Sequence, residues 1–207
     1  MAATTDHTTA AAHGQETVGT KHGLSAALIA MLLFIGSEVM LFASLFTAYF
    51  FIRYGVSNEQ WPPLRNNGEP FELPVFLTGI NTLILVASSF TLWWGEKCLK
   101  AGDRTGLIRG LWVTILMGST FLIIQLNEYA HLGFTPQDRA FSGAFYTLTG
   151  FHGLHVLVGL IVLSMCLRRA YKHDFTATKH TALAAGSYYW HFVDIVWVLL
   201  FLLVYVI

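Results

Sequence analysis

Charged residues are scarce in this chain of 207 residues: 12 Lys and Arg and 12 Asp and Glu make up only 12% of it. Soluble domains carry about 25% charged residues, so the composition excludes an ordinary soluble protein. The formal net charge is zero, which gives no indication of a nucleic-acid or acidic partner. Because 55% of the residues are hydrophobic, we expect an integral membrane protein that forms one compact bundle.

Cysteine is also scarce, and a secretory signal is lacking. The two cysteines, Cys98 and Cys166, lie near the ends of apolar runs on the same predicted side, the cytoplasm, so we expect no disulfide. Residues 1–23 are polar and rich in Ala, Thr and His, without a basic start and a short apolar core. We expect a mobile polar cytoplasmic tail over 1–23 and a transmembrane domain over 24–207.

Long apolar runs are what the chain has. A helix crosses the hydrocarbon core with about 20 apolar residues. Five runs are long enough, at roughly 24–51, 74–94, 107–128, 140–167 and 188–207. The predicted fold class is therefore all-α, a polytopic membrane bundle of five transmembrane helices.

The distribution of Lys and Arg predicts the orientation. One side of the membrane would carry Lys21, Lys97, Lys100, Arg104, Arg109, Arg168, Arg169, Lys172 and Lys179. The other side would carry only Arg53, Arg65 and Arg139. Basic residues accumulate on the cytoplasmic side, so the N-terminus is predicted in the cytoplasm and the C-terminus outside.

Three further groups concern the membrane interface and the helix contacts. An aromatic belt at the cytoplasmic interface is predicted for Trp93, Trp94, Tyr188, Tyr189 and Trp190. Arg168, Arg169 and Lys172 either bind anionic lipid headgroups or reflect only the positive-inside rule. Close helix approach is predicted at the small residues Gly143, Gly150, Gly153 and Gly159.

Ionisable side chains inside the apolar runs are costly and mark candidate functional sites. Glu38 lies about fourteen residues, roughly 21 Å, into the first predicted helix, near the midplane. A carboxyl group at that depth is expected to be protonated, paired or hydrated. It is either a proton-exchanging acid or a neutral structural group that bonds a neighbouring helix.

Two histidine-containing pairs follow in later helices. His152 and His155 are three apart, so they share one helix face, where they can ligate a metal or haem or bond another helix. A metal would need further ligands, and the spacing alone favours hydrogen bonding. His191 and Asp194 share a face of the last helix in the same way. We predict that these four residues and Glu38 form one buried polar cluster if the first, fourth and last helices are neighbours.

Other polar groups have weaker functional interpretations. Glu128, at the outer end of the third helix, either pairs with Arg139 or, as the favoured interpretation, is a solvated interfacial acid. The amides of Asn81 and Gln125 are predicted to join helices without a chemical role. No residue is predicted as catalytic and no metal site is predicted.

Several stretches resemble a known family in order along the chain, from Leu24 to the C-terminus. They are 37–50 (SEVMLFASLFTAYF), 80–89 (INTLILVASS), 127–129 (NEY), Phe134 with Thr135, 143–159 with GFHGLHV at 150–156, and 189–197 (YWHFVDIVW). Together they resemble subunit III of haem–copper oxidases, in its short five-helix bacterial form.

This resemblance implies a non-redox core subunit of a bacterial terminal oxidase, a complex of aerobic respiration that reduces oxygen to water and pumps protons. Haems and copper would lie on the partner subunits I and II, with no cofactor on this chain except bound phospholipid. Glu38 would correspond to the family's carbodiimide-reactive glutamate. The subunit would stabilise the catalytic subunit, support proton uptake, and contact phospholipids and possible neighbouring respiratory complexes in the bacterial cell membrane.

Other interpretations stay open from the residues alone. Within the superfamily, the chain is alternatively subunit III of a quinol oxidase or the accessory subunit of a nitric oxide reductase. A proton-coupled transporter that uses Glu38 and the histidines would be a different class, but inverted repeats and broken helices, typical of transporters, are not visible. A haem-binding protein that uses His152 or His155 is a third interpretation.

Overall fold

The structure is a computed structural model that describes residues 26–56, 74–132, 135–137, 140–176 and 180–206. The predicted cytoplasmic tail, Lys21, Arg65, Arg139 and Lys179 lie outside these residues. The described elements are α1 (Ala26–Phe51), the π-helical turn η1 (Ile52–Val56), α2 (Val75–Lys100), α3 (Arg104–His131), α4 (Ala140–Tyr171), α5 (Thr181–Leu200) and the π-helical turn η2 (Phe201–Val206).

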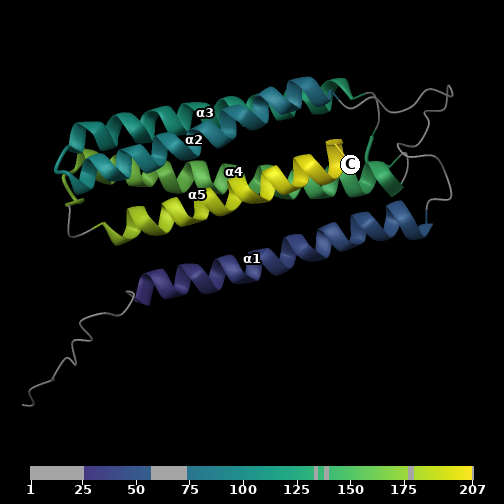
Figure 1. Ribbon diagram of the computed structural model, residues 1–207, viewed down its shortest axis with the longest axis horizontal. Coiled ribbons are helices and arrows are strands. Elements are labelled where there is room, and N and C mark those ends of the chain that lie inside the picture. The colour runs from purple at the N-terminus through teal and green to yellow at the C-terminus, as the bar shows by residue number, and fades with distance from the viewer. Residues whose placement is uncertain (1–25, 57–73, 133–134, 138–139, 177–179, 207) are drawn as a thin grey trace, which may run out of the picture.

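Five of these helices are long and apolar enough to cross a membrane, which confirms the predicted all-α membrane bundle. Figure 1 shows them side by side along their lengths, with α1 at one edge of the bundle next to α5. The tightest packing joins α2 to α3, and α4 packs against both α3 and α5. Helix α1 contacts α4 and α5 and is far more exposed than the other four helices.

The helices extend beyond the predicted apolar runs. Helix α2 ends at Lys100 rather than near residue 94, and α5 begins at Thr181 rather than near residue 188. Hydropathy marks the part of a helix that lies in hydrocarbon, whereas backbone hydrogen bonding continues through polar turns outside it. At the α2–α3 turn, Gly102 adopts φ 85° and the Asp103 carboxylate accepts a hydrogen bond from the Gly106 N–H at 3.0 Å. These two residues end one helix and begin the next.

The early start of α5 corrects part of the predicted aromatic belt. Trp93, Trp94 and Tyr188 are about half exposed, as a belt requires. Tyr189 and Trp190 are instead buried, because they lie more than two turns inside α5. Trp190 is only 1% exposed, and its indole Nε1 donates to Ser88 Oγ of α2 at 3.0 Å.

Two glycines make room for the Trp190 ring. A Cβ atom added at Gly118 of α3 would lie 2.5 Å from Trp190 Cη2, and one added at Gly159 of α4 would lie 2.8 Å from Cε3. The predicted close approach therefore occurs at Gly159, whereas a Cβ at Gly150 would meet nothing within 4 Å. Three helices and α5 thus meet around one indole ring.

We expect Gly159→Ala to lower the free energy of unfolding by about 1–2 kcal/mol, because the added methyl group overpacks the Trp190 ring. Gly150→Ala is the matched control on α4, and it should be neutral or stabilising because alanine favours the helix more than glycine does. Thermal unfolding of the two purified variants measures the difference. Equal stabilities would contradict the close packing of Trp190.

Candidate functional site

A hydrogen bond between the carboxyl group of Glu38 and the imidazole ring of His155 joins α1 to α4. Glu38 Oε2 lies 2.7 Å from His155 Nε2, and the side chains are 16% and 11% exposed. The other ring nitrogen, Nδ1, lies 2.7 Å from the carbonyl oxygen of Phe151. A carbonyl oxygen can only accept, so Nδ1 carries a hydrogen. One further proton then lies between Nε2 and Oε2, either on the carboxyl group or on the imidazole.

Aromatic side chains surround this pair. The Phe42 ring meets the His155 ring edge-on at 4.9 Å, and the Tyr189 hydroxyl donates to the backbone carbonyl of His155 at 3.3 Å. Phe42 is buried, so the pair is shielded on the side of α5 while its own atoms remain partly accessible. This arrangement can hold a proton at membrane depth.

The neighbouring histidine has a different environment. His152 is buried, and its ring lies 4.7 Å from Trp197 and 6.0 Å from Phe121. Neither of its ring nitrogens has a hydrogen-bond partner among the described residues. Both nitrogens of His155 are already engaged, by Glu38 and Phe151. The two histidines therefore do not present a shared pair of free ligand atoms.

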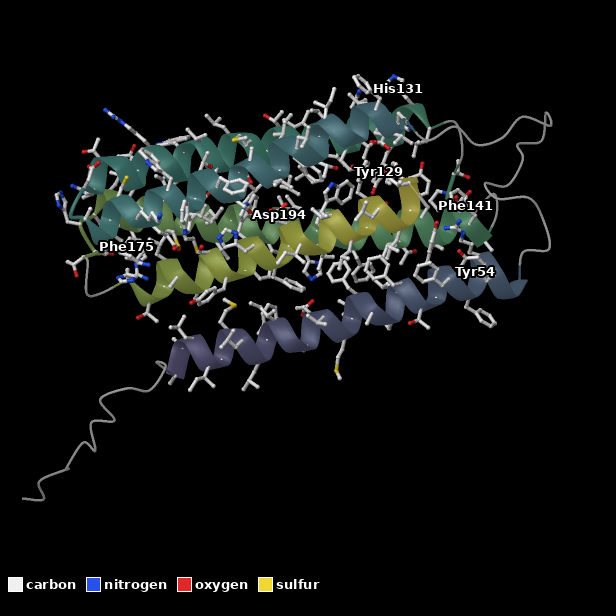
Figure 2. All side chains as sticks on the ribbon, viewed as in Figure 1. Tyr54, Tyr129, His131, Phe141, Phe175 and Asp194 are labelled. Carbon is white, nitrogen blue, oxygen red and sulfur yellow. The ribbon has the colours of Figure 1, made fainter. Side chains whose placement is uncertain are left out.

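His191 and Asp194 line a separate pocket between α2 and α5, with a volume of about 330 Å³. Figure 2 shows Asp194 in the middle of the bundle, far from Phe175 at one end and His131 at the other. On α5, Phe192 points towards α1, where its ring lies 6.3 Å from that of Phe42. At 3.6 residues per turn, Asp194 lies about 200° around α5 from Phe192, nearly opposite to it, and His191 lies about 100° away. Both residues line the pocket with α2.

The predicted single cluster is therefore corrected. Helices α1, α4 and α5 are neighbours, as predicted. The structure brings Glu38 and His155 together, places His152 in the core, and directs His191 and Asp194 to a pocket with α2. Knowing which helices are neighbours was not enough to predict the cluster. The rotation of α5 about its axis, which is set by the aromatic residues of α5 that pack against α1, decides which of its polar residues face α1.

The interpretation of Glu128 as a solvated acid is also wrong. Glu128 is 3% exposed, and its Oε1 accepts a hydrogen bond from the Tyr205 hydroxyl at 3.0 Å. Its Oε2 lies 3.1 Å from Thr78 Oγ1, a hydroxyl that also lies 3.0 Å from the carbonyl oxygen of Pro74. The alternative partner, Arg139, is outside the described residues. No sequence pattern indicated Tyr205 as the partner, because the position of its side chain depends on the π-helical turn η2.

Comparison with known proteins adds the identity of the family. A family model described as cytochrome c oxidase subunit III matches residues 4–207. The chain belongs to the cytochrome c oxidase subunit III family. A relative named cytochrome c oxidase subunit 3 from Thermostichus vulcanus is 41% identical over 180 residues, which cover 86% of this chain and 86% of the relative.

Animal proteins with the same name are also similar to this chain. The one from Locusta migratoria is 37% identical and covers 90% of this chain and 73% of its own length. The one from Oryctolagus cuniculus is 38% identical and covers 84% of this chain and 67% of its own length. These matches confirm the resemblance seen in the sequence motifs, and they favour an oxidase subunit over a transporter or a haem-binding protein.

As a member of the subunit III family, the chain is a multi-pass membrane protein that assembles with other subunits of an oxidoreductase complex. No three His, Cys, Asp or Glu side chains gather as candidate metal ligands in the part of the chain that the structure describes. Arg168, Arg169 and Lys172 are exposed at the end of α4 that is predicted to be cytoplasmic. Arg169 also lies 3.5 Å from the Asp174 carboxylate.

Proposed function

We propose that this chain is the non-redox subunit III of a bacterial cytochrome c oxidase, a terminal oxidase that reduces oxygen to water and pumps protons across the cell membrane. Subunits I and II are its partners, and they carry the haems and copper. The Glu38–His155 pair is the observation that carries the specific role of this chain: support of proton uptake by the catalytic subunit, together with stabilisation of that subunit.

The chemistry of the pair supports this role. An exchangeable proton lies between Glu38 Oε2 and His155 Nε2, which are 2.7 Å apart. Because both side chains are partly exposed on the surface of the bundle, a proton-carrying group of a partner subunit can reach the pair without unfolding the bundle. The pair also links α1 to α4, so the group that holds the proton stabilises the helix contact at the same time.

Phospholipid binding belongs to the same proposal. Arg168, Arg169 and Lys172 lie within five residues at one end of α4, where anionic headgroups gather next to a membrane. The Asp174 carboxylate holds Arg169 only loosely, at 3.5 Å, and leaves the three cations accessible to a headgroup. Lipids held there would contribute to the contact between this chain and its partners.

Replacement of Glu38 by glutamine in the assembled oxidase tests the proposal. Loss of a catalytic acid costs about 10²–10⁴-fold in rate, whereas we expect Glu38→Gln to leave the initial rate of oxygen reduction within about twofold. Proton uptake should become slower, and the enzyme should complete fewer turnovers before it loses activity. Stopped-flow proton uptake and a turnover-limited oxygen-electrode trace measure these two quantities.

Ser37→Ala is a suitable control, because Ser37 is the neighbour of Glu38 and its exposed hydroxyl donates to the carbonyl oxygen of Phe34 within α1. It should match the unmodified oxidase in every measurement. Loss of nearly all initial oxidase rate in a fully assembled Glu38→Gln complex would overturn the supporting role. The subunit list and optical spectrum of the purified complex would test the partners and the electron donor, since a copper-binding cysteine pair on subunit II indicates cytochrome c rather than quinol.

A further inference from the structure

The pocket between α2 and α5 is lined by a buried acid, and one of its two oxygen atoms lacks a hydrogen-bond donor among the described residues. Asp194 is 8% exposed, and its Oδ1 has no hydrogen-bond partner among the residues that the structure describes. Ser89 and His191 both interact with the carboxyl group, and Ser89 is near enough to approach it as a hydrogen-bond donor. Within hydrogen-bond distance and angle, however, no described side chain reaches Oδ1 or Ser89 Oγ. A buried polar atom without a partner destabilises the fold, so this site favours a ligand that donates a hydrogen bond.

The depth of the pocket limits the source of that donor. Lys97 Nζ lies 3.5 Å above the Trp93 ring, an arrangement typical of the headgroup level of a membrane. Ser89 lies eight residues before Lys97 on α2, roughly 12 Å further into the bilayer at 1.5 Å per residue. Lipid headgroups stay near the level of Lys97. A donor for Asp194 must therefore come from a group that lies within the hydrocarbon region.

The shape of the pocket suits a protein side chain. Its volume of about 330 Å³ is at the lower limit of the roughly 300–1,000 Å³ typical of small-molecule sites. Phe90 is 65% exposed and Trp93 is 50% exposed, so two large aromatic side chains lie on the open side. An apolar rim around one unsatisfied polar group is the arrangement expected where transmembrane helices associate.

We infer that this pocket receives a hydrogen-bond-donating side chain, basic or hydroxyl-bearing, from a transmembrane helix of another oxidase subunit. This inference rests on the proposed function, because it requires the chain to be part of an oxidase complex. Asp194 and Ser89 bind the incoming side chain, and Phe90 and Trp93 pack against the partner helix. The α2–α5 face is then a subunit contact surface, on the side of α5 opposite the Glu38–His155 pair.

A photo-crosslinking amino acid, p-benzoylphenylalanine, placed at Phe90 in the intact oxidase in its native membrane tests the inference. We expect a covalent adduct with another oxidase subunit, mapped by mass spectrometry to a transmembrane helix with a donor side chain within one turn of the attachment point. Phe76, also exposed on α2 but near its other end, is the control position and should not attach to the same site. Adducts only with phospholipid at Phe90 would overturn the inference.

A second comparison tests Asp194 itself. Asp194→Leu should lower the Phe90 adduct yield by about threefold to tenfold, the range that interhelical polar contacts supply. Asp194→Asn keeps the size of the side chain and should lower it less. Ser142→Ala is the control, because Ser142 is a buried hydroxyl of α4 outside this pocket. If the yield of the Phe90 adduct is unchanged in Asp194→Leu, Asp194 does not bind the partner side chain.

The two proposals fail in different ways. If the chain purifies with haem-containing subunits but Phe90 attaches only to lipid, the inference is wrong and the proposed function stands. If the chain purifies without any haem-containing subunit, the proposed function fails and the inference fails with it. The crosslinking experiment at Phe90 is carried out with Asp194 unchanged, so its outcome does not depend on whether the Asp194 variants fold.

Discussion

Replacement of Trp190 by alanine is expected to lower the free energy of unfolding by about 3–5 kcal/mol, the range for loss of a large buried aromatic side chain. The ring lies between Gly118 of α3 and Gly159 of α4, where an added Cβ atom would lie 2.5 Å and 2.8 Å from it. Removal of the ring leaves a cavity between α3, α4 and α5, and this cavity cannot close unless one of these helices moves. The Ser88 hydroxyl also loses the indole donor that lies 3.0 Å away.

Thiol labelling measures this loss. Cys166 is buried in α4 beside α5, so in a Cys98→Ser background its reaction with a maleimide on heating reports opening of the bundle. Trp94→Ala is the matched control, because Trp94 lies at the exposed surface of α2. Ser88→Ala, which removes the hydrogen bond but leaves the ring, should cost about 1 kcal/mol. Equal effects of Trp190→Ala and Trp94→Ala would contradict the packing described.

Glu128→Leu is expected to cost about 2–3 kcal/mol, because it leaves the buried Tyr205 hydroxyl without its acceptor. Thr78 is affected less, since its hydroxyl retains the carbonyl oxygen of Pro74 at 3.0 Å. Tyr205→Phe removes the donor instead of the acceptor, and the double variant removes both. If the 3.0 Å contact between Tyr205 and Glu128 is the main interaction, the double variant should be more stable than the sum of the single effects predicts.

The same thiol-labelling assay measures all three variants. Thr120→Ala is a suitable control on α3, because the exposed Thr120 hydroxyl donates to the carbonyl oxygen of Leu116 in its own helix. Strict additivity of Glu128→Leu and Tyr205→Phe would show that the two side chains do not interact. A solvated Glu128, as the sequence suggested, would also give additivity.

Hydropathy was sufficient for the number and order of the helices, because an uninterrupted apolar run has few alternatives to a membrane-spanning helix. It was insufficient for the start of α5, since the polar turn from Thr181 onwards is helical outside the apolar run. That difference is what made Trp190 look like an interfacial residue. Sequence motifs were sufficient for the family, because several of them occur in the same order across all five helices.

The candidate site was only partly predictable. The sequence predicted Glu38 and His155 as members of one cluster of five residues, but it did not predict that these two would form the pair. The environments of Asp194 and Glu128 could not be predicted from the sequence. Each depends on how a helix is rotated about its axis, which the sequence pattern does not specify. For Asp194 it is the face of α5 set by Phe192, and for Glu128 it is the π-helical turn that places Tyr205.

Helix α1 has few contacts for its length, and this limits how firmly it is held. Only a small part of it is buried, and it meets α4 and α5 without touching the α2–α3 pair extensively. Local opening of a structure begins where the fewest buried contacts must be broken. We therefore expect helix α1 to separate from the bundle before the other four helices, and the hydrogen bond between Glu38 and His155 to stabilise its contact with α4.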